Sequence, residues 1–84
     1  MIELAAARLT VLETLGEVLE TPVDDLRANP VLASHAWDSL RSLEALTQLE
    51  VRLGVDFDLR TFNAARTVDD LVRLIVPGEL AAHA

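Results

Sequence analysis

Apolar residues at helical spacing run through most of this chain and indicate an all-helical fold. Near the N-terminus, Leu4, Val11 and Leu15 recur at intervals of seven and four residues, which places them on one side of a helix. Further apolar residues widen that side: Ile2, Ala5, Leu9, Leu12, Val18 and Leu19. We predict a first helix over residues 2–19. It should end there because Pro22 disfavours helical dihedrals at the residue before it.

The segment that follows, residues 21–37, contains two prolines and predicts a long loop rather than a continuous helix. Residues 23–26 could form a single turn. Four apolar residues should anchor the loop on the helices: Val23, Leu26, Val31 and Leu32. Loops of this length are usually functional or disordered, and the anchors favour an ordered loop. Two antiparallel helices would also need such a crossover merely to reverse direction.

A second helix is predicted over residues 39–53. Asp38 should be its N-cap, which places Ser39 in the first turn, where a group joined to it would project into solvent. The core side of this helix should carry Ala45, Leu46, Leu49 and Leu53.

Three other apolar residues of the second helix, Leu40, Leu43 and Val51, fall on a separate stripe. Leaving a leucine in water forgoes roughly 1.5–3 kcal/mol of burial, so we expect the stripe to have a use. It could form a binding surface. Alternatively, Leu43 could pack against a neighbouring helix, and single exposed leucines are ordinary.

Gly54 should end the second helix as a left-handed cap. The alternation of Val55, Phe57 and Leu59 with aspartates predicts an extended segment whose apolar side chains plug the bundle. A short helix over residues 59–65 should follow, with Asp58 as its cap and Phe62 as its core anchor.

Thr67 and Asp70 have the spacing of a capping box and should open a last helix with Val68, Leu71, Val72 and Ile75 facing inward. The sequence therefore predicts an all-α fold of three longer helices and one short helix, with a long first loop. We expect a single domain over residues 1–84, with its helical core at about 2–76 and a loose tail at 77–84.

Charge and composition exclude several functions. The formal charge is −7, from 14 acidic and 7 basic residues, which argues against nucleic acid as a partner. An acidic surface suits docking onto basic proteins, and it also serves solubility. No apolar run approaches the roughly 20 residues of a membrane span, no signal peptide is recognisable, and cysteine is absent. We expect a cytoplasmic, monomeric protein.

Three motifs stand in order along the chain: DSLRSLEAL at residues 38–46, LEVRLGV at 49–55 and TVDDLV at 67–72. Together they resemble the acyl and peptidyl carrier proteins, whose signatures begin with D-S-L at the second helix. The same family has L-E-x-x-(F/L)-G-V at the end of that helix and T-V-x-D-L at the start of the last one. The resemblance covers about residues 2–75, and it implies a four-helix bundle of acyl-carrier type without catalytic activity.

The resemblance further implies that Ser39 accepts 4′-phosphopantetheine from coenzyme A, and that the thiol of this arm holds a substrate as a thioester. Asp38 would cap the helix and help the phosphopantetheinyl transferase to bind its metal and cofactor. Other implied partners are an acyl- or aminoacyl-loading enzyme and downstream condensing and tailoring enzymes. The docking face that the resemblance implies consists of Leu40, Leu43, Glu44, Thr47, Glu50 and Val51. The short helix would border the arm and its cargo.

Two departures from the family bear on the pathway. A G-G-x-S pattern, typical of nonribosomal peptide modules, is absent before Ser39, and Arg41 and Arg52 interrupt the acidic helix of primary fatty-acid carriers. We therefore expect a stand-alone carrier of a polyketide, nonribosomal peptide or related specialised pathway. A primary fatty-acid or D-alanyl carrier is the alternative. From a different class, an unmodified helical adaptor could use the Leu40–Leu43–Val51 stripe for binding.

The sequence gives weaker support for a catalytic site or a metal site. Ser39, Asp38 and His35 contain the residue types of a hydrolase triad, but Asp38 directly precedes the serine and no nucleophile-elbow pattern surrounds it. We expect His35 to be an exposed loop residue that could contact the arm's phosphate. His35 and His83 are the only histidines and the carboxylates lack calcium-loop spacing, so we expect no metal site.

Trp37 stands where carriers usually have a small or aliphatic residue. It should close the end of the bundle with its N–H on a loop carbonyl, or else contact the transferase or the cargo.

Overall fold

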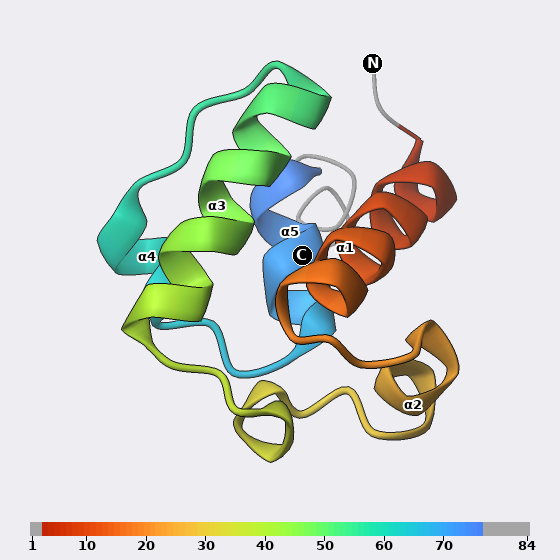
Figure 1. Cartoon of the computed structure of the whole chain (residues 1–84). Helices are drawn as coiled ribbons and strands as arrows, with labels where there is room; N and C mark the ends of the chain where they lie inside the picture. The colour runs from red at the N-terminus through yellow and green to blue at the C-terminus, as the bar shows by residue number, and fades with distance from the viewer. Residues whose placement is uncertain (1–2, 77–84) are drawn as a thin grey trace.

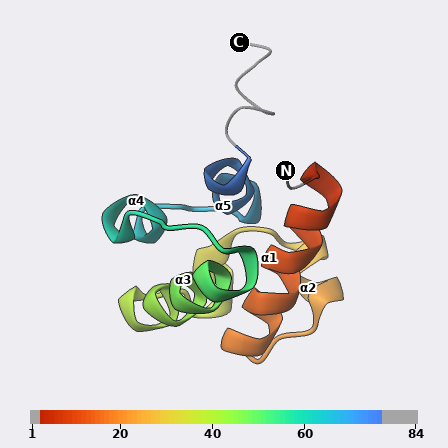
Figure 2. The same cartoon turned by 90° about the horizontal axis from the view of Figure 1, so that it is seen from above.

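A computed structural model describes residues 3–76 and confirms the all-helical fold of acyl-carrier type. The predictions for Ile2 and for the tail lie outside the described residues. Figures 1 and 2 show α1 (Leu4–Val18), α2 (Val23–Ala28), α3 (Ser39–Leu53), α4 (Leu59–Asn63) and α5 (Val68–Ile75). The long first connection, between α1 and α3, contains α2 and a 3-10 turn, η1 (Leu32–His35). Helix α1 packs against α2, α3 and α5, and α3 packs against α4.

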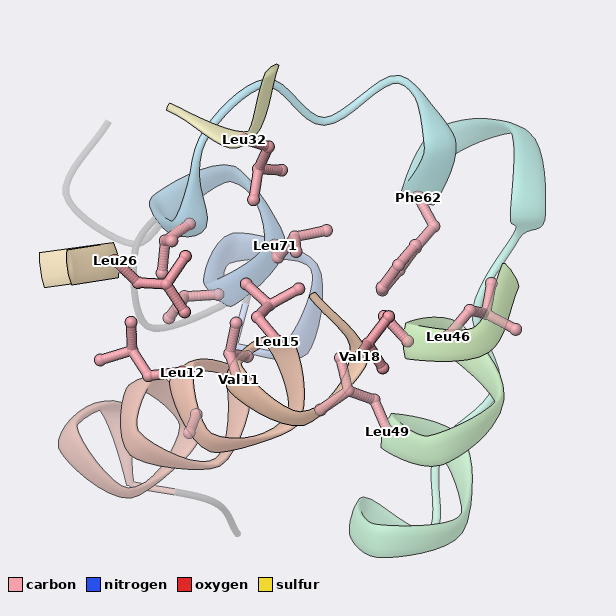
Figure 3. Packing of buried hydrophobic residues seen from close by; sticks show 14 of the residues in the cluster. Val11, Leu12, Leu15, Val18, Leu26, Leu32, Leu46, Leu49, Phe62 and Leu71 are labelled. Carbon is pink, nitrogen blue, oxygen red and sulfur yellow. The ribbon is translucent and has the colours of Figure 1, made fainter. Parts of the chain in front are cut away.

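The core lies between α1, α3 and α5, and α1 supplies much of it (Figure 3). Val11 and Leu15 are fully buried, as the helical spacing predicts. The prediction that Ala5 and Leu9 widen this side is wrong, because both residues are exposed. Leu9 precedes Val11 by two residues and so lies about 200° around the helix from it. The fully buried residue on that turn is Ala7.

The long connection is held to the start of α5 by backbone hydrogen bonds. The N–H of Leu32 donates to the carbonyl of Arg66 at 2.9 Å, and that of Val68 donates to the carbonyl of Pro30 at 3.0 Å. Leu26 and Leu32 are completely buried, as predicted. Val31 was predicted as an anchor but is exposed, because its backbone forms the bridge to Thr67 while its side chain stays in solvent.

Local capping signals are confirmed along the second half of the chain. Gly54 ends α3 in the left-handed region at φ 67°, and the Asp58 side chain caps α4 by accepting from the N–H of Thr61. Thr67 and Asp70 form the expected capping box of α5. Helix α4 ends at Asn63, two residues before the predicted end. The N–H of Ala64 still donates to the carbonyl of Arg60, four residues back, but that of Ala65 donates to the carbonyl of Phe62 and closes a tighter turn.

Two arginines from opposite ends of α3 bind the C-terminal end of α1. Arg41 donates a hydrogen bond of 2.9 Å to the carbonyl oxygen of Val18. Arg52 donates to the hydroxyl of Thr14 at 2.7 Å and forms an ion pair with Glu17 at 2.7 Å. These contacts give both guanidinium groups a structural role in the packing of α3 on α1.

Candidate functional site

Ser39 is the first residue of α3, and its side chain is exposed at the helix end. The extended backbone of Asp38 places its carboxylate over the first turn, where Oδ1 accepts from the N–H of Arg41 at 2.8 Å. The carbonyl of Asp38 also accepts from the N–H of Ser42 at 2.8 Å. The predicted N-cap is thus confirmed. It holds the turn that carries Ser39 while leaving the serine hydroxyl in solvent.

An open hollow of about 520 Å³ lies between the start of α3 and α4. Its lining residues are Ser39, Asp58, Leu59, Arg60 and Asn63. Hydrogen bonds from the hydroxyl and the N–H of Thr61 lower the pKa of Asp58, so this carboxylate is ionised at neutral pH. The hollow offers one cation, one carboxylate and an amide beside the serine.

A phosphate joined to Ser39 fits this environment. The first backbone N–H groups of a helix have no partner within it, and the helix dipole favours negative charge at this end. The exposed guanidinium of Arg60 adds a cation on the rim of the hollow. The open volume beside Ser39 leaves room for an attached group without displacing a buried side chain.

Trp37 packs against the core and is not among the residues that line the hollow. Its ring lies 6.0 Å from that of Phe62 between centroids, and Phe62 in turn lies 5.4 Å from Phe57. The predicted packing role is therefore confirmed. The predicted hydrogen bond is wrong, because Nε1 is buried and has no hydrogen-bond partner among the described residues.

The residues of the possible hydrolase triad do not come together. The Nε2 atom of His35 lies 2.7 Å from the carbonyl oxygen of Asn29 and must donate to it, and the carboxylate of Asp38 caps α3. His35 is half-buried rather than fully exposed. Within residues 3–76, no group of three His, Cys, Asp or Glu side chains could hold a metal ion. The same residues include no helix long and apolar enough to cross a membrane.

The second apolar stripe of α3 faces solvent. Leu40 is 61%, Leu43 45% and Val51 80% exposed. The alternative prediction, that Leu43 packs against a neighbouring helix, is therefore wrong. Glu44 and Thr47 are also exposed, and with Leu43 they line a shallow depression. Glu50 differs from the other predicted docking residues, because it is half-buried and its carboxylate accepts from the N–H of Phe57 at 2.9 Å.

The sequence did not lead us to predict the environment of two residues near the site. Leu59 was predicted to plug the bundle, but it is 46% exposed and lines the hollow beside Ser39. Ser42, one turn after Ser39, is fully buried, and its hydroxyl has no hydrogen-bond partner in the described part of the chain. Its position next to Ala45 and Leu46 on the core side gave the signal for burial.

Comparison with known proteins identifies the family. The family model described as "Phosphopantetheine attachment site" matches residues 10–75, which include Ser39 and most of the chain. The chain belongs to this family. It is also 37% identical over 70 residues to the non-reducing polyketide synthase ausA of Emericella nidulans, a match that covers 83% of this chain. The chain spans only 3% of the length of that synthase. No solved structure matches significantly.

Domains of the phosphopantetheine attachment family carry 4′-phosphopantetheine covalently and do not catalyse reactions themselves. The chain is therefore a carrier rather than an enzyme, as the motifs predicted, and 4′-phosphopantetheine is its cofactor. The exposed serine, its place at the N-terminus of a helix and the open hollow all suit this group.

Proposed function

We propose that Ser39 is the attachment point of 4′-phosphopantetheine and that the domain carries polyketide intermediates. One observation supports the assignment above all. Ser39 is the exposed first residue of α3 and follows the capping Asp38 within the segment that matches the family. The other serine of this turn, Ser42, is fully buried and is out of reach of a modifying enzyme.

The residues of this chain have distinct roles in the proposal. Asp38 fixes the first turn of α3, and the unpaired N–H groups of that turn favour the phosphate. Ser39 supplies the hydroxyl oxygen, which loses its proton and attacks the phosphorus of coenzyme A that bears the pantetheine arm. The phosphoanhydride bond then breaks and adenosine 3′,5′-bisphosphate leaves. When bound, the arm supplies the thiol on which an intermediate is held as a thioester. The domain then works by tethering, because a bound intermediate is present at high effective concentration for each enzyme that docks.

The exposed stripe of α3 is the proposed docking surface for the phosphopantetheinyl transferase, the loading enzyme and the condensing and tailoring enzymes. Leu40, Leu43 and Val51 offer apolar contacts, and Glu44 and Thr47 lie among them. The negative charge of the chain favours approach to basic enzyme surfaces. Glu50 supports the loop at Phe57, so we propose for it a smaller part in docking.

The similarity to a non-reducing polyketide synthase supports the polyketide pathway over fatty-acid and D-alanyl carriers. The stand-alone arrangement and the cytoplasmic location stay predictions from the sequence. Trapping the loaded thioester from cells and identifying the acyl group by mass spectrometry tests the pathway. A polyketide intermediate supports the proposal, and a simple fatty acyl or D-alanyl group contradicts it.

The attachment site is tested by incubating the protein with coenzyme A and a broad-specificity phosphopantetheinyl transferase. We expect the intact mass to rise by one 4′-phosphopantetheine group. Ser39→Ala should abolish the gain, and Ser42→Ala is the matched control that should retain it. A wild-type protein that gains no mass, or a Ser39→Ala variant that gains it, contradicts the proposal. If the protein is instead an unmodified adaptor, the wild type should gain no mass, and the Ser39→Ala variant should bind its partner as well as the wild type does.

A further inference from the structure

Arg41 joins the turn that carries Ser39 to the end of α1. Its backbone N–H donates to the Asp38 carboxylate at 2.8 Å, and its guanidinium donates to the carbonyl oxygen of Val18 at 2.9 Å. The two residues before it, Ser39 and Leu40, are exposed, whereas Arg41 is half-buried. Among the side chains of residues 39–41, only that of Arg41 is recorded in a hydrogen bond to another helix.

The acceptor makes this contact a strong one. Val18 is the last residue of α1, and the final carbonyl groups of a helix lack partners within it. They also lie at the negative end of the helix dipole, which favours a cation. Just beyond, Glu20 reverses the chain with a positive φ of 52°. The guanidinium therefore binds a carbonyl that is held in place by a tight turn.

Arg52 provides an internal comparison at the other end of α3. It binds the same end of α1 through Thr14 and Glu17, so it stabilises the same helix pair. It follows Ser39 by 13 positions in the sequence, which corresponds to about 20 Å along a helix. Loss of Arg52 should weaken the packing of α3 on α1 without loosening the first turn of α3.

We propose that Arg41 is a positioning residue that holds the Ser39 hydroxyl in place for attachment of the arm. The inference rests on the proposed function of Ser39. Helix ends fray unless they are held. Asp38 caps this one from within, and the Arg41 bond to Val18 ties the capped turn to α1. The transferase must align the serine oxygen with the phosphorus it attacks, and small misplacements of reacting atoms slow such reactions strongly.

The test compares Arg41→Ala, Arg41→Lys and Arg52→Ala with the wild type, using two transferases with different surfaces. We expect Arg41→Ala to lower kcat roughly tenfold with both transferases. Arg41→Lys should recover part of the rate, because lysine keeps a donor and the charge. Arg52→Ala should lower the midpoint of unfolding comparably while leaving kcat within about twofold of the wild type.

Amide hydrogen exchange in the unmodified protein separates positioning from direct contact with the transferase. For Arg41→Ala, exchange at the N–H groups of residues 41 and 42 should quicken roughly tenfold, and Arg52→Ala should leave both unchanged. A defect confined to KM or to one transferase, with unchanged exchange, overturns the inference. So does equal kcat for the Arg41→Ala and Arg52→Ala variants. If the wild type gains no arm at all, the proposed function fails first and the positioning role with it.

Discussion

Phe62 is the anchor of α4, and its removal gives the sharpest test of the fold. The ring is fully buried, whereas the other α4 residues, 59–61 and 63, are all exposed. In Figure 3 the ring points from α4 into the cluster that α1 and α3 form. Truncating a buried phenylalanine to alanine costs about 3–5 kcal/mol, a large part of the roughly 5–15 kcal/mol that stabilises a small domain.

The loss can be measured by urea unfolding followed through the fluorescence of Trp37, the one tryptophan of the chain, which packs on Phe62. We expect Phe62→Ala to lower the free energy of unfolding by about 3–5 kcal/mol and to shift native emission toward that of a wetter indole. Phe62→Leu, which keeps much of the volume, should lose about 1–1.5 kcal/mol.

Leu59→Ala is the matched control for Phe62→Ala, because Leu59 lies on the same helix and is 46% exposed. It should lose no more than about 0.5 kcal/mol. A Phe62→Ala variant that loses less than about 1 kcal/mol, or one whose native emission is unchanged, would refute the anchoring argument.

Three further predictions follow from local geometry. Ser42→Ala removes a buried hydroxyl without a recorded partner, so urea unfolding should show equal or higher stability, by up to about 1 kcal/mol. Gly54→Ala forces a side chain into the left-handed region at φ 67° and should cost about 1 kcal/mol, with Gly54→Asn costing less. Asp70 has a lowered pKa, chiefly because it accepts from the N–H of Arg66. Its stabilisation is therefore complete above about pH 4 and is lost as the pH falls through the folded-state pKa. Asp70→Asn should flatten the acid side of the stability–pH curve, measured against the wild type.

The caps were predictable from the sequence because each depends on neighbours within a few residues. Asp38 and Asp58 each bond the N–H three residues on, and the capping box joins Thr67 to Asp70 across the same interval. Ser39 could be located in advance for the same reason. It directly follows a recognisable cap and precedes a helix of regular apolar spacing.

Burial at loops and helix ends was less predictable, because it depends on partners that are distant in the sequence. Val31 directly precedes the buried Leu32, and Leu59 lies one helical turn before the buried Phe62, yet the path of the backbone leaves both exposed. The partners of Arg41 and Arg52 lie 23 to 38 residues earlier in the chain. No local pattern reveals such pairs, so from the sequence both arginines stood out only as departures from the acidic helix of primary fatty-acid carriers.

The distribution of contacts around α3 accounts for how a carrier could serve several enzymes in turn. Ala45 and Leu49 fix the helix in the core, and the two arginines fasten it to α1, so its inward-facing contacts are satisfied within the domain. What remains is the stripe of Leu40, Leu43 and Val51, each side chain worth at most about 1.5–3 kcal/mol on burial. On the docking proposal, part of this gain is offset by the cost of association. A face this small suits weak, reversible complexes, which a carrier needs in order to leave each enzyme after delivering its cargo.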